Sequence, residues 1–321
     1  MLAAAIEPVS GYADEFAEFT FGRYRPFLSA PEPGQVTVGA RVAGKPIGLA
    51  LAAWRSDLAE ARLFSLMVAP AYRRQAIGRS LLAACESLVA DAGRARLHAF
   101  YSSLLPAAGP FAALLVVRGW NSPQACELRC CVPAGALADA IAGWPGVTGR
   151  MLANAGITIA CWAERTAQDT AAIEKLSQPS SCPGSLSPQY WSGLFDEGTS
   201  LVLRAHGEIV GWILARLDPS GGADAAVPPT LFVPAAFIRR DLWRSGMLVA
   251  AYHAISRGHA DRFGATAPVR FSTSSSYPGM MALTRRRIAP VALWIDDWMG
   301  SSKSLVSRID GSTSSPVRLQ A

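Results

Sequence analysis

The sequence has few of the residues that build metal centres. It contains four histidines and six cysteines among 321 residues, and no two pairs of cysteines have the CxxC spacing of a structural zinc site. Several of the cysteines lie in apolar patterns, where cysteine acts as a small hydrophobic residue. We therefore expect no metal ion, and a reducing, cytoplasmic setting.

Long apolar runs and long basic runs are also missing. No stretch approaches the roughly 20 apolar residues of a membrane span, and Met1–Pro8 lacks the basic start and the apolar length of a signal peptide. The formal net charge of +6 is spread over short groups such as Arg73-Arg74 and Arg239-Arg240. Binding to nucleic acid would call for a basic stripe. We expect neither membrane nor nucleic acid as a partner, and the positive balance suits a small anionic ligand.

The sequence also has no Gly-x-Ser-x-Gly motif, which argues against a serine hydrolase with a nucleophile elbow. It is rich in apolar residues, with 50% hydrophobic and only 17% charged residues. A chain of 321 residues exceeds a typical single domain, so length and composition predict two compact domains.

The most informative stretch runs from Val68 to Leu82. An apolar strand, Leu63–Val68, leads into a short loop, and a helix with apolar spacing follows directly. The first turn of a helix has unpaired N–H groups and the positive end of the helix dipole, which together bind phosphate. Ala76 and Gly78 are small enough for a ligand to approach the backbone. Arginines surround them, so the stretch predicts a pyrophosphate site.

The same stretch resembles the acyl-CoA-binding motif of the GNAT acyltransferase superfamily, Arg/Gln-x-x-Gly-x-Gly/Ala. Arg73 takes the first position, Gly78 the last, and Ala76 replaces the first glycine. The resemblance implies acetyl-CoA, or another acyl-CoA, as cosubstrate. The residues it implies for cofactor binding are Leu66, Met67, Val68, Arg73, Arg74, Gln75, Ala76, Ile77, Gly78, Arg79 and Ser80.

The residues before this stretch fit the same resemblance. A hairpin is predicted from Gln35–Val42 and Ile47–Trp54, followed by a third strand over 60–68. In the GNAT fold that strand splays from a parallel neighbour, here Arg96–Tyr101, and the thioester lies in the gap between them. Aromatic residues of the first thirty positions either line the acceptor pocket or pack in the core; these are Phe16, Phe19, Phe21, Tyr24 and Phe27.

The second half repeats the first in outline. Gly207 follows Gly44, and Gly211 follows Gly48, at one common offset in the sequence (207 − 44 = 211 − 48 = 163). The second copy has Asp241–Gly246 where the first has its small residues, and an acidic residue and a tryptophan there oppose pyrophosphate binding. We predict that only the first copy binds acyl-CoA.

The expected fold is α/β (α+β), with two tandem GNAT-like domains. Each has a mixed, mostly antiparallel twisted sheet with helices on both faces. The predicted boundaries are 1–133 for the first domain, 134–156 for a linker, 157–300 for a degenerate second domain, and 301–321 for a disordered, serine-rich tail.

Acyl transfer needs a base for the amine and a proton for the leaving thiolate. Glu60 is the expected base, with Asp57 second, although Glu60 also fits a solvated carboxylate at a strand end. The family's usual tyrosine acid is replaced by Leu115, which leaves Tyr101 and Ser102 as substitutes, unless Tyr101 only packs. His98 is interpreted as a core or pocket residue.

The predicted function is an acetyl-CoA-dependent N-acyltransferase (N-acetyltransferase) that acts on the amine of a small molecule. Two alternatives stay open. One is a non-catalytic CoA-binding sensor or scaffold, and the other is an acyltransferase that uses a longer acyl-CoA or an acyl carrier protein. A monomer or homodimer is expected.

Overall fold

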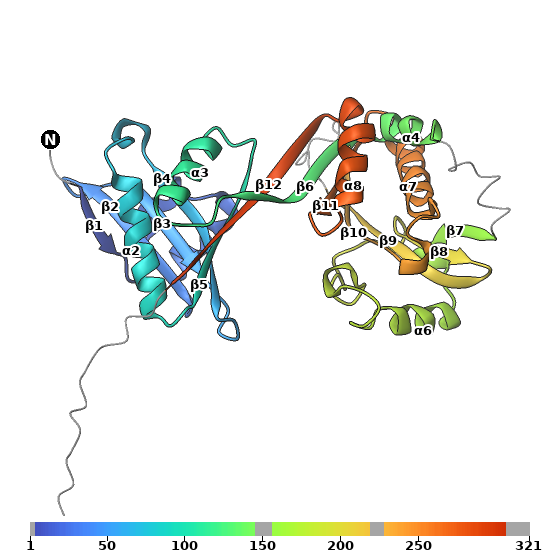
Figure 1. The fold of residues 1–321 in the computed structure, drawn as a ribbon, viewed down its shortest axis with the longest axis horizontal. Coiled ribbons are helices and arrows are strands. Elements are labelled where there is room, and N and C mark those ends of the chain that lie inside the picture. Colours follow the sequence, from blue (N-terminus) through green and yellow to red (C-terminus); the bar gives the residue numbers. More distant parts are fainter. Residues whose placement is uncertain (1–3, 145–155, 219–227, 306–321) are drawn as a thin grey trace, which may run out of the picture. The chain divides into compact units, whose positions relative to one another are not determined.

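The computed structural model describes residues 4–144, 156–218 and 228–305. These residues form two compact units (Figure 1). The first unit contains the described residues of 1–125 together with 298–305, and the second contains those of 126–297. No helix in the described ranges is long and apolar enough to cross a membrane.

The first unit has one mixed sheet in the order β1-β2-β3-β4-β5-β12. Neighbouring strands are antiparallel except β4 and β5, which run parallel. Its strands are β1 (Ala5–Pro8), β2 (Gln35–Val42), β3 (Lys45–Ala53), β4 (Glu60–Val68), β5 (Arg96–Ser102) and β12 (Trp294–Ser304). Its helices are η1 (Asp14–Phe19), η2 (Gly22–Tyr24), α1 (Pro26–Ser29), η3 (Pro70–Tyr72), α2 (Ile77–Asp91) and α3 (Ala108–Val117).

Helices cover both faces of this sheet because β3 is apolar on both sides. Ala50 and Ala52 pack with α2 and α3, whereas Leu49 and Leu51 pack with the short helices η1 and α1. Successive strand residues point to opposite faces, so one run of apolar residues builds two cores. We call the side of α2 and α3 the helix face, and the side of η1 and α1 the opposite face.

The second unit has the sheet order β6-β11-β10-β9-β8-β7, with β10 and β11 parallel. Its strands are β6 (Gln124–Pro133), β7 (Ile157–Cys161), β8 (Leu201–Ala205), β9 (Glu208–Asp218), β10 (Thr230–Ile238) and β11 (Pro268–Ser274). Its helices are α4 (Ala134–Ala142), η4 (Trp162–Glu164), α6 (Ala167–Leu176), η5 (Gly184–Leu186), η6 (Arg240–Leu242), α7 (Met247–Phe263), α8 (Pro278–Leu283), η7 (Thr284–Ile288) and η8 (Ala289–Val291). The predicted fold class is confirmed for both units.

The internal repeat extends to the bounds of elements and to single residues. β10, η6 and α7 begin at one common offset from β4, η3 and α2 (230 − 60 = 240 − 70 = 247 − 77 = 170). Arg41 and Arg204 are related by the offset of the hairpin glycines (204 − 41 = 163), and each binds a carboxylate near the start of an earlier helix of its own unit, Glu15 in η1 and Asp169 in α6. The arginine on Asp169, with the capping Thr166, holds the pKa of that carboxyl well below its usual value.

The unit boundaries differ from the predicted ones. β6, predicted to close the first domain, pairs with β11 of the second unit, and α4, placed in the linker, packs in that unit's core. Conversely, residues 301–304, predicted as tail, form part of β12 and pair with β5. Because β6 and β12 begin at the same offset as the other repeated elements (294 − 124 = 170), each unit receives the corresponding strand from the other half of the sequence. The remainder of the predicted tail, from 306 on, and the later part of the predicted linker, 145–155, lie outside the described residues.

Candidate functional site

The segment that joins β4 to α2 leaves a helix N-terminus open. α2 begins at Ile77 without a side-chain cap, and its first turn contains no acidic residue. The residue before it, Ala76, has a left-handed backbone (φ 62°), as does Arg74 (φ 65°). Glycine adopts that conformation freely, whereas alanine adopts it at a cost of about 1 kcal/mol. The backbone shape that a glycine favours is therefore kept at Ala76.

Gly78 leaves free space beside this helix end. A Cβ atom built on Gly78 would lie 3.7 Å from Val68 Cγ2 and 3.8 Å from Leu114 Cδ2, which are ordinary contacts. The protein's own packing therefore does not require glycine there. A ligand that passes between β4 and α3 and touches the backbone would require it.

Positive charge surrounds the same helix end. Arg73, Arg74 and Arg79 are exposed, and Arg73 is held in place because its Nε donates to Val68 O at 3.0 Å. Unpaired N–H groups, the helix dipole and arginines are the donor set that binds a pyrophosphate. These residues therefore fit the diphosphate of a CoA-type molecule.

The end of β4 next to this segment is separated from β5. The two strands pair from Glu60 with Arg96 to Leu63 with Ala99, and no pair follows. A bulge at Phe64 shifts the register of β4 against β3 at the same point. Beyond Leu63 a gap opens, and β4 residues 66–68 border it. The expected splay of β4 from β5 is thus present.

The structure separates the predicted catalytic residues. Glu60 lies at the paired end of β4, and Tyr101 and Ser102 lie five and six positions further along the parallel strand β5 than Arg96, the partner of Glu60. At about 3.3 Å per residue, Glu60 and Tyr101 are about 16 Å apart along the sheet. A single reacting atom cannot touch both residues.

Tyr101 and Ser102 also lie on opposite faces. Tyr101 belongs to the core on the helix face, where its ring packs edge-on against Phe111 with centroids 5.0 Å apart. Burial raises the pKa of its hydroxyl. Ser102, the next residue of the strand, points the other way, and its Oγ accepts from Leu104 N–H at 3.1 Å. Leu115 is fully buried.

His98 is the neighbour that sequence reasoning did not assign to Glu60. Its Nε2 is buried and lies 3.1 Å from Glu60 Oε2, without the alignment of a hydrogen bond, while Arg96 approaches the same carboxylate at 3.8 Å. His98 and Phe100 stack with parallel rings, 6.1 Å between centroids. The sequence did indicate that His98 and Phe100 share one face of the strand, because they alternate with the apolar residues Leu97 and Ala99. The register between β4 and β5, which brings Glu60 to His98, cannot be deduced from the sequence.

The predicted aromatic cluster divides into two groups. Phe16 and Phe19 are buried in the core on the opposite face. Tyr24 and Phe27 are half-buried and lie on Phe64, the bulged residue, with centroid distances of 4.7 and 5.6 Å. Together with Phe100 of β5, these three rings form what we call the aromatic face.

A hollow of about 290 Å³ lies beside the end of β4. It is bordered by η1, by the start of β3 and by the residues that lead to Arg73. Its lining includes Phe19, Ile47, Met67 and Tyr72.

The corresponding place in the second unit is closed. Leu248 occupies the position of Gly78 (248 − 78 = 170), and Ser245 Oγ accepts from the N–H of Met247, the first residue of α7. Trp243 takes the position of Arg73 (243 − 73 = 170), and its indole N–H donates to Ile238 O at 3.1 Å. Asp241 is bound through both carboxylate oxygens to an arginine. The side chain of Leu248, the cap from Ser245 and the loss of the cation at position 243 all oppose pyrophosphate binding at this helix end.

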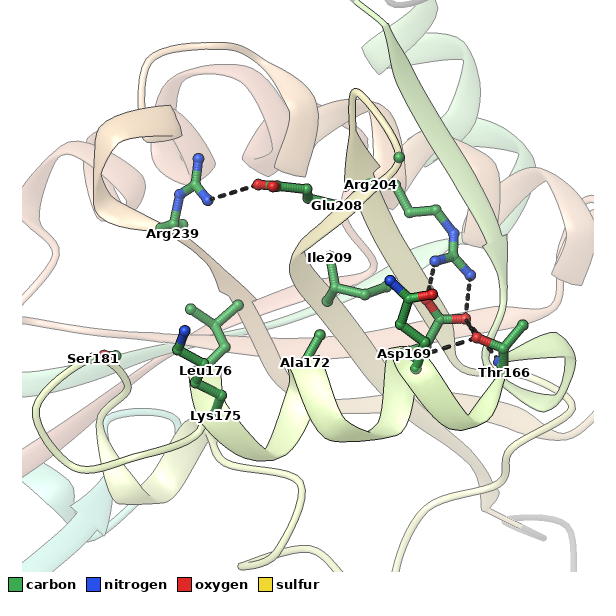
Figure 2. A pocket seen from close by; sticks show the side chains of 12 residues that line it. Thr166, Asp169, Ala172, Lys175, Leu176, Ser181, Arg204, Glu208, Ile209 and Arg239 are labelled. Carbon is green, nitrogen blue, oxygen red and sulfur yellow. Dashed lines mark hydrogen bonds and ion pairs between the residues drawn. The ribbon is translucent and has the colours of Figure 1, made fainter.

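The second unit has instead a wider pocket of about 630 Å³ between α6 and the β8–β9 hairpin. Figure 2 shows Arg204 and Asp169 facing each other on one side of it, and Arg239 directed at Glu208 on another. These charges are paired with one another within the second unit. Among the described residues no group of histidine, cysteine and carboxylate side chains has the arrangement of a metal site.

Comparison with known proteins finds a family that the first unit resembles. Residues 6–109 match the model of the acetyltransferase (GNAT) family. No curated protein matches the sequence significantly.

Solved structures share the fold of both units. A tandem GNAT protein from the clavulanic acid biosynthesis pathway is 15% identical with a TM-score of 0.58, and the match covers 95% of this chain and 99% of that one. A GCN5-related N-acetyltransferase from Sphaerobacter thermophilus is 16% identical with a TM-score of 0.54, over 88% and 85% of the two chains. The GCN5-related glucosamine N-acetyltransferase region of a fungal multi-domain GH3 β-N-acetylglucosaminidase is 12% identical with a TM-score of 0.62. That match covers 94% of this chain but 38% of the fungal one.

Proposed function

Because residues 6–109 match the model of the acetyltransferase (GNAT) family, we propose that the first unit transfers an acyl group from acyl-CoA, with acetyl-CoA as the donor, to the amine of a small molecule. The observation that carries this proposal is the open N-terminus of α2 with the bare backbone of Gly78, directly beside the gap between β4 and β5. Acetyl-CoA supplies an activated thioester, and the first unit supplies its position.

The donor and the amine bind on different faces of the sheet. The donor lies on the helix face, between Gly78, Val68 and Leu114, and its thioester reaches the gap. Backbone groups of β4 that have no partner in β5 are available there to polarise the carbonyl. The amine therefore approaches from the opposite face, past the aromatic face.

The transfer forms an amide C–N bond and breaks the thioester C–S bond. The amine loses a proton, which passes through water to His98, with Glu60 beside it at the closed end of the gap. The departing thiolate takes a proton from Tyr101, whose hydroxyl is protonated at neutral pH as in an ordinary tyrosine. Ser102 lies on the side of the amine, so we assign it no part in protonating the sulfur.

The His98 assignment predicts a loss of turnover without a loss of donor binding. His98→Asn is expected to lower kcat about 100-fold and Glu60→Gln somewhat less, since a positioned base contributes factors of this size. Affinity for acetyl-CoA, measured by calorimetry, stays unchanged because neither residue lies near the 73–80 segment. Asp57→Asn is the control, since Asp57 is exposed and binds Arg55. A His98→Asn variant with the kcat of the parent protein contradicts the assignment.

Thiol release with a library of small amines tests the proposed function. We expect release with acetyl-CoA that depends on an added amine. The second candidate, a CoA-binding sensor, is favoured by the buried hydrocarbon side chain of Leu115 at the family's acid position. It predicts that acetyl-CoA binds and that no amine causes release. Release only with a longer acyl-CoA or with an acyl carrier protein replaces the proposed donor.

A further inference from the structure

Arg62 is a cation on β4 for which the described residues supply no carboxylate or hydrogen-bond partner. It is exposed, and its guanidinium lies over the ring of Phe100, 4.7 Å from the centroid, and 5.9 Å from that of Phe64. Other arginines of the sheet, such as Arg41 in the same unit, bind carboxylates. A guanidinium held on two aromatic rings and left without an anion has donors free for a ligand.

The register places Arg62 at the closed end of the gap. Arg62 pairs with His98, Leu63 pairs with Ala99, and the strands then separate. The aromatic contacts show that Arg62 points to the opposite face, the side from which the amine approaches. Phe64, two residues further on, borders the open gap, so Arg62 lies about 7 Å along the strand from the place of reaction.

The surroundings of Arg62 are aromatic and carry a second positive charge. Tyr24 stacks on Phe64 at 25° between ring planes, and Arg23 lies over Tyr24 at 4.6 Å. The carboxylate of Glu60, at the same end of β4, is already approached by His98 and an arginine. A ligand with an aromatic ring and a negative group complements this surface, whereas a ligand with only positive charge does not.

The second unit has no cation at the position that corresponds to Arg62. Phe232 occupies the position of Arg62 (232 − 62 = 170). Arg216 and Arg270 lie over that ring at 5.0 and 4.9 Å, and both are near Asp218, at 3.8 and 2.9 Å. An unpaired arginine on aromatic rings beside the gap is therefore a feature of the unit with the open helix end.

We infer that the acceptor is an aromatic amine that also carries a carboxylate, as an aromatic amino acid does, and that Arg62 binds the carboxylate. This inference rests on the proposed acyl transfer and names its substrate class. A carboxylate bound to Arg62 lies a few bonds from the amine, and the ring lies on the aromatic face. Arg62 is thus a residue that sets specificity.

The test compares matched amines with and without the carboxylate: phenylalanine with phenethylamine, tyrosine with tyramine, and tryptophan with tryptamine. For the parent protein we expect kcat/KM at least about 30-fold higher for the amino acids, the size of a charge-assisted hydrogen-bonded pair. Arg62→Gln is expected to remove most of this preference through KM and to leave the decarboxylated amines unaffected. Arg62→Lys restores part of it, and Arg55→Gln, at an exposed position, changes nothing.

Calorimetry with acetyl-CoA on each variant distinguishes a failure of the substrate inference from a failure of the proposed acyl transfer. The inference is overturned, and acyl transfer stands, if the parent protein binds acetyl-CoA and acetylates amines without a carboxylate as well as it acetylates amino acids. The same conclusion follows if Arg62→Gln lowers kcat/KM equally for both classes of amine. If acetyl-CoA binds and neither class of amine reacts, the inference is likewise overturned. If acetyl-CoA does not bind to the parent protein, the proposed function fails, and the inference fails with it.

Discussion

Replacement of Gly78 by leucine is expected to abolish acetyl-CoA binding in the otherwise folded protein. A leucine there would fill the space between Val68 and Leu114 that the donor needs, and it would reproduce what the second unit has at Leu248. A steric block of this kind, together with the loss of backbone contacts, costs at least about 3 kcal/mol, or more than 100-fold in Kd. Isothermal titration calorimetry measures it.

The internal repeat offers a matched control for this prediction. Leu248→Gly makes the reverse change at the corresponding position of the second unit and is expected to leave the single acetyl-CoA site intact. Circular dichroism of both variants shows whether the fold is kept. A Gly78→Leu protein that binds acetyl-CoA as the parent does would show that the donor does not lie against α2.

Removal of the Glu86 carboxylate is expected to destabilise the first unit by about 3 kcal/mol. Glu86 lies on α2, is 5% exposed, and accepts from Trp120 Nε1 and Lys303 Nζ, each at 2.7 Å, as well as from Arg118. Glu86→Ala leaves two partly buried cations and a buried indole N–H without their acceptor. The midpoint of urea unfolding, followed by tryptophan fluorescence, measures the loss.

The control for Glu86 is an ion pair of the same unit that is open to water. Arg55 and Asp57 are 77% and 58% exposed, so Asp57→Ala is expected to change stability by less than about 0.5 kcal/mol. Glu86→Gln keeps the shape of the side chain and the hydrogen bond from Trp120, so we expect its loss of stability to lie between those of Glu86→Ala and Asp57→Ala. Equal midpoints for Glu86→Ala and Asp57→Ala would refute the structural role of this network.

The parts of the fold that could be predicted are those determined by residues close together in the sequence. Gln35–Val42 and Glu60–Val68 are strands with the bounds that alternation and turn residues predict, and the helix after the loop begins at Ile77 as its apolar spacing indicates. The loop could be found because a helix end, small residues and arginines adjoin in sequence.

The exchange of β6 and β12 could not be predicted, because it joins residues that are far apart in the chain. Lys303 binds Glu86 across 217 positions, and nothing local in the serine-rich stretch around it distinguishes a strand from a tail. The same reason hid the neighbours of Glu60 and Arg62. Which residues of β4 and β5 face each other depends on strand register, so the site's charges could be named from the sequence but not paired.

Native mass spectrometry of the whole protein, with acetyl-CoA titrated in, tests the central claim most directly. We predict that one acetyl-CoA binds per chain, and that a variant carrying Arg73→Glu and Gly78→Glu binds none while keeping the charge-state distribution of a folded protein. Two molecules per chain would show that the second unit also binds the donor. No binding to the parent protein, or binding that survives in the variant, would contradict a donor site at the N-terminus of α2.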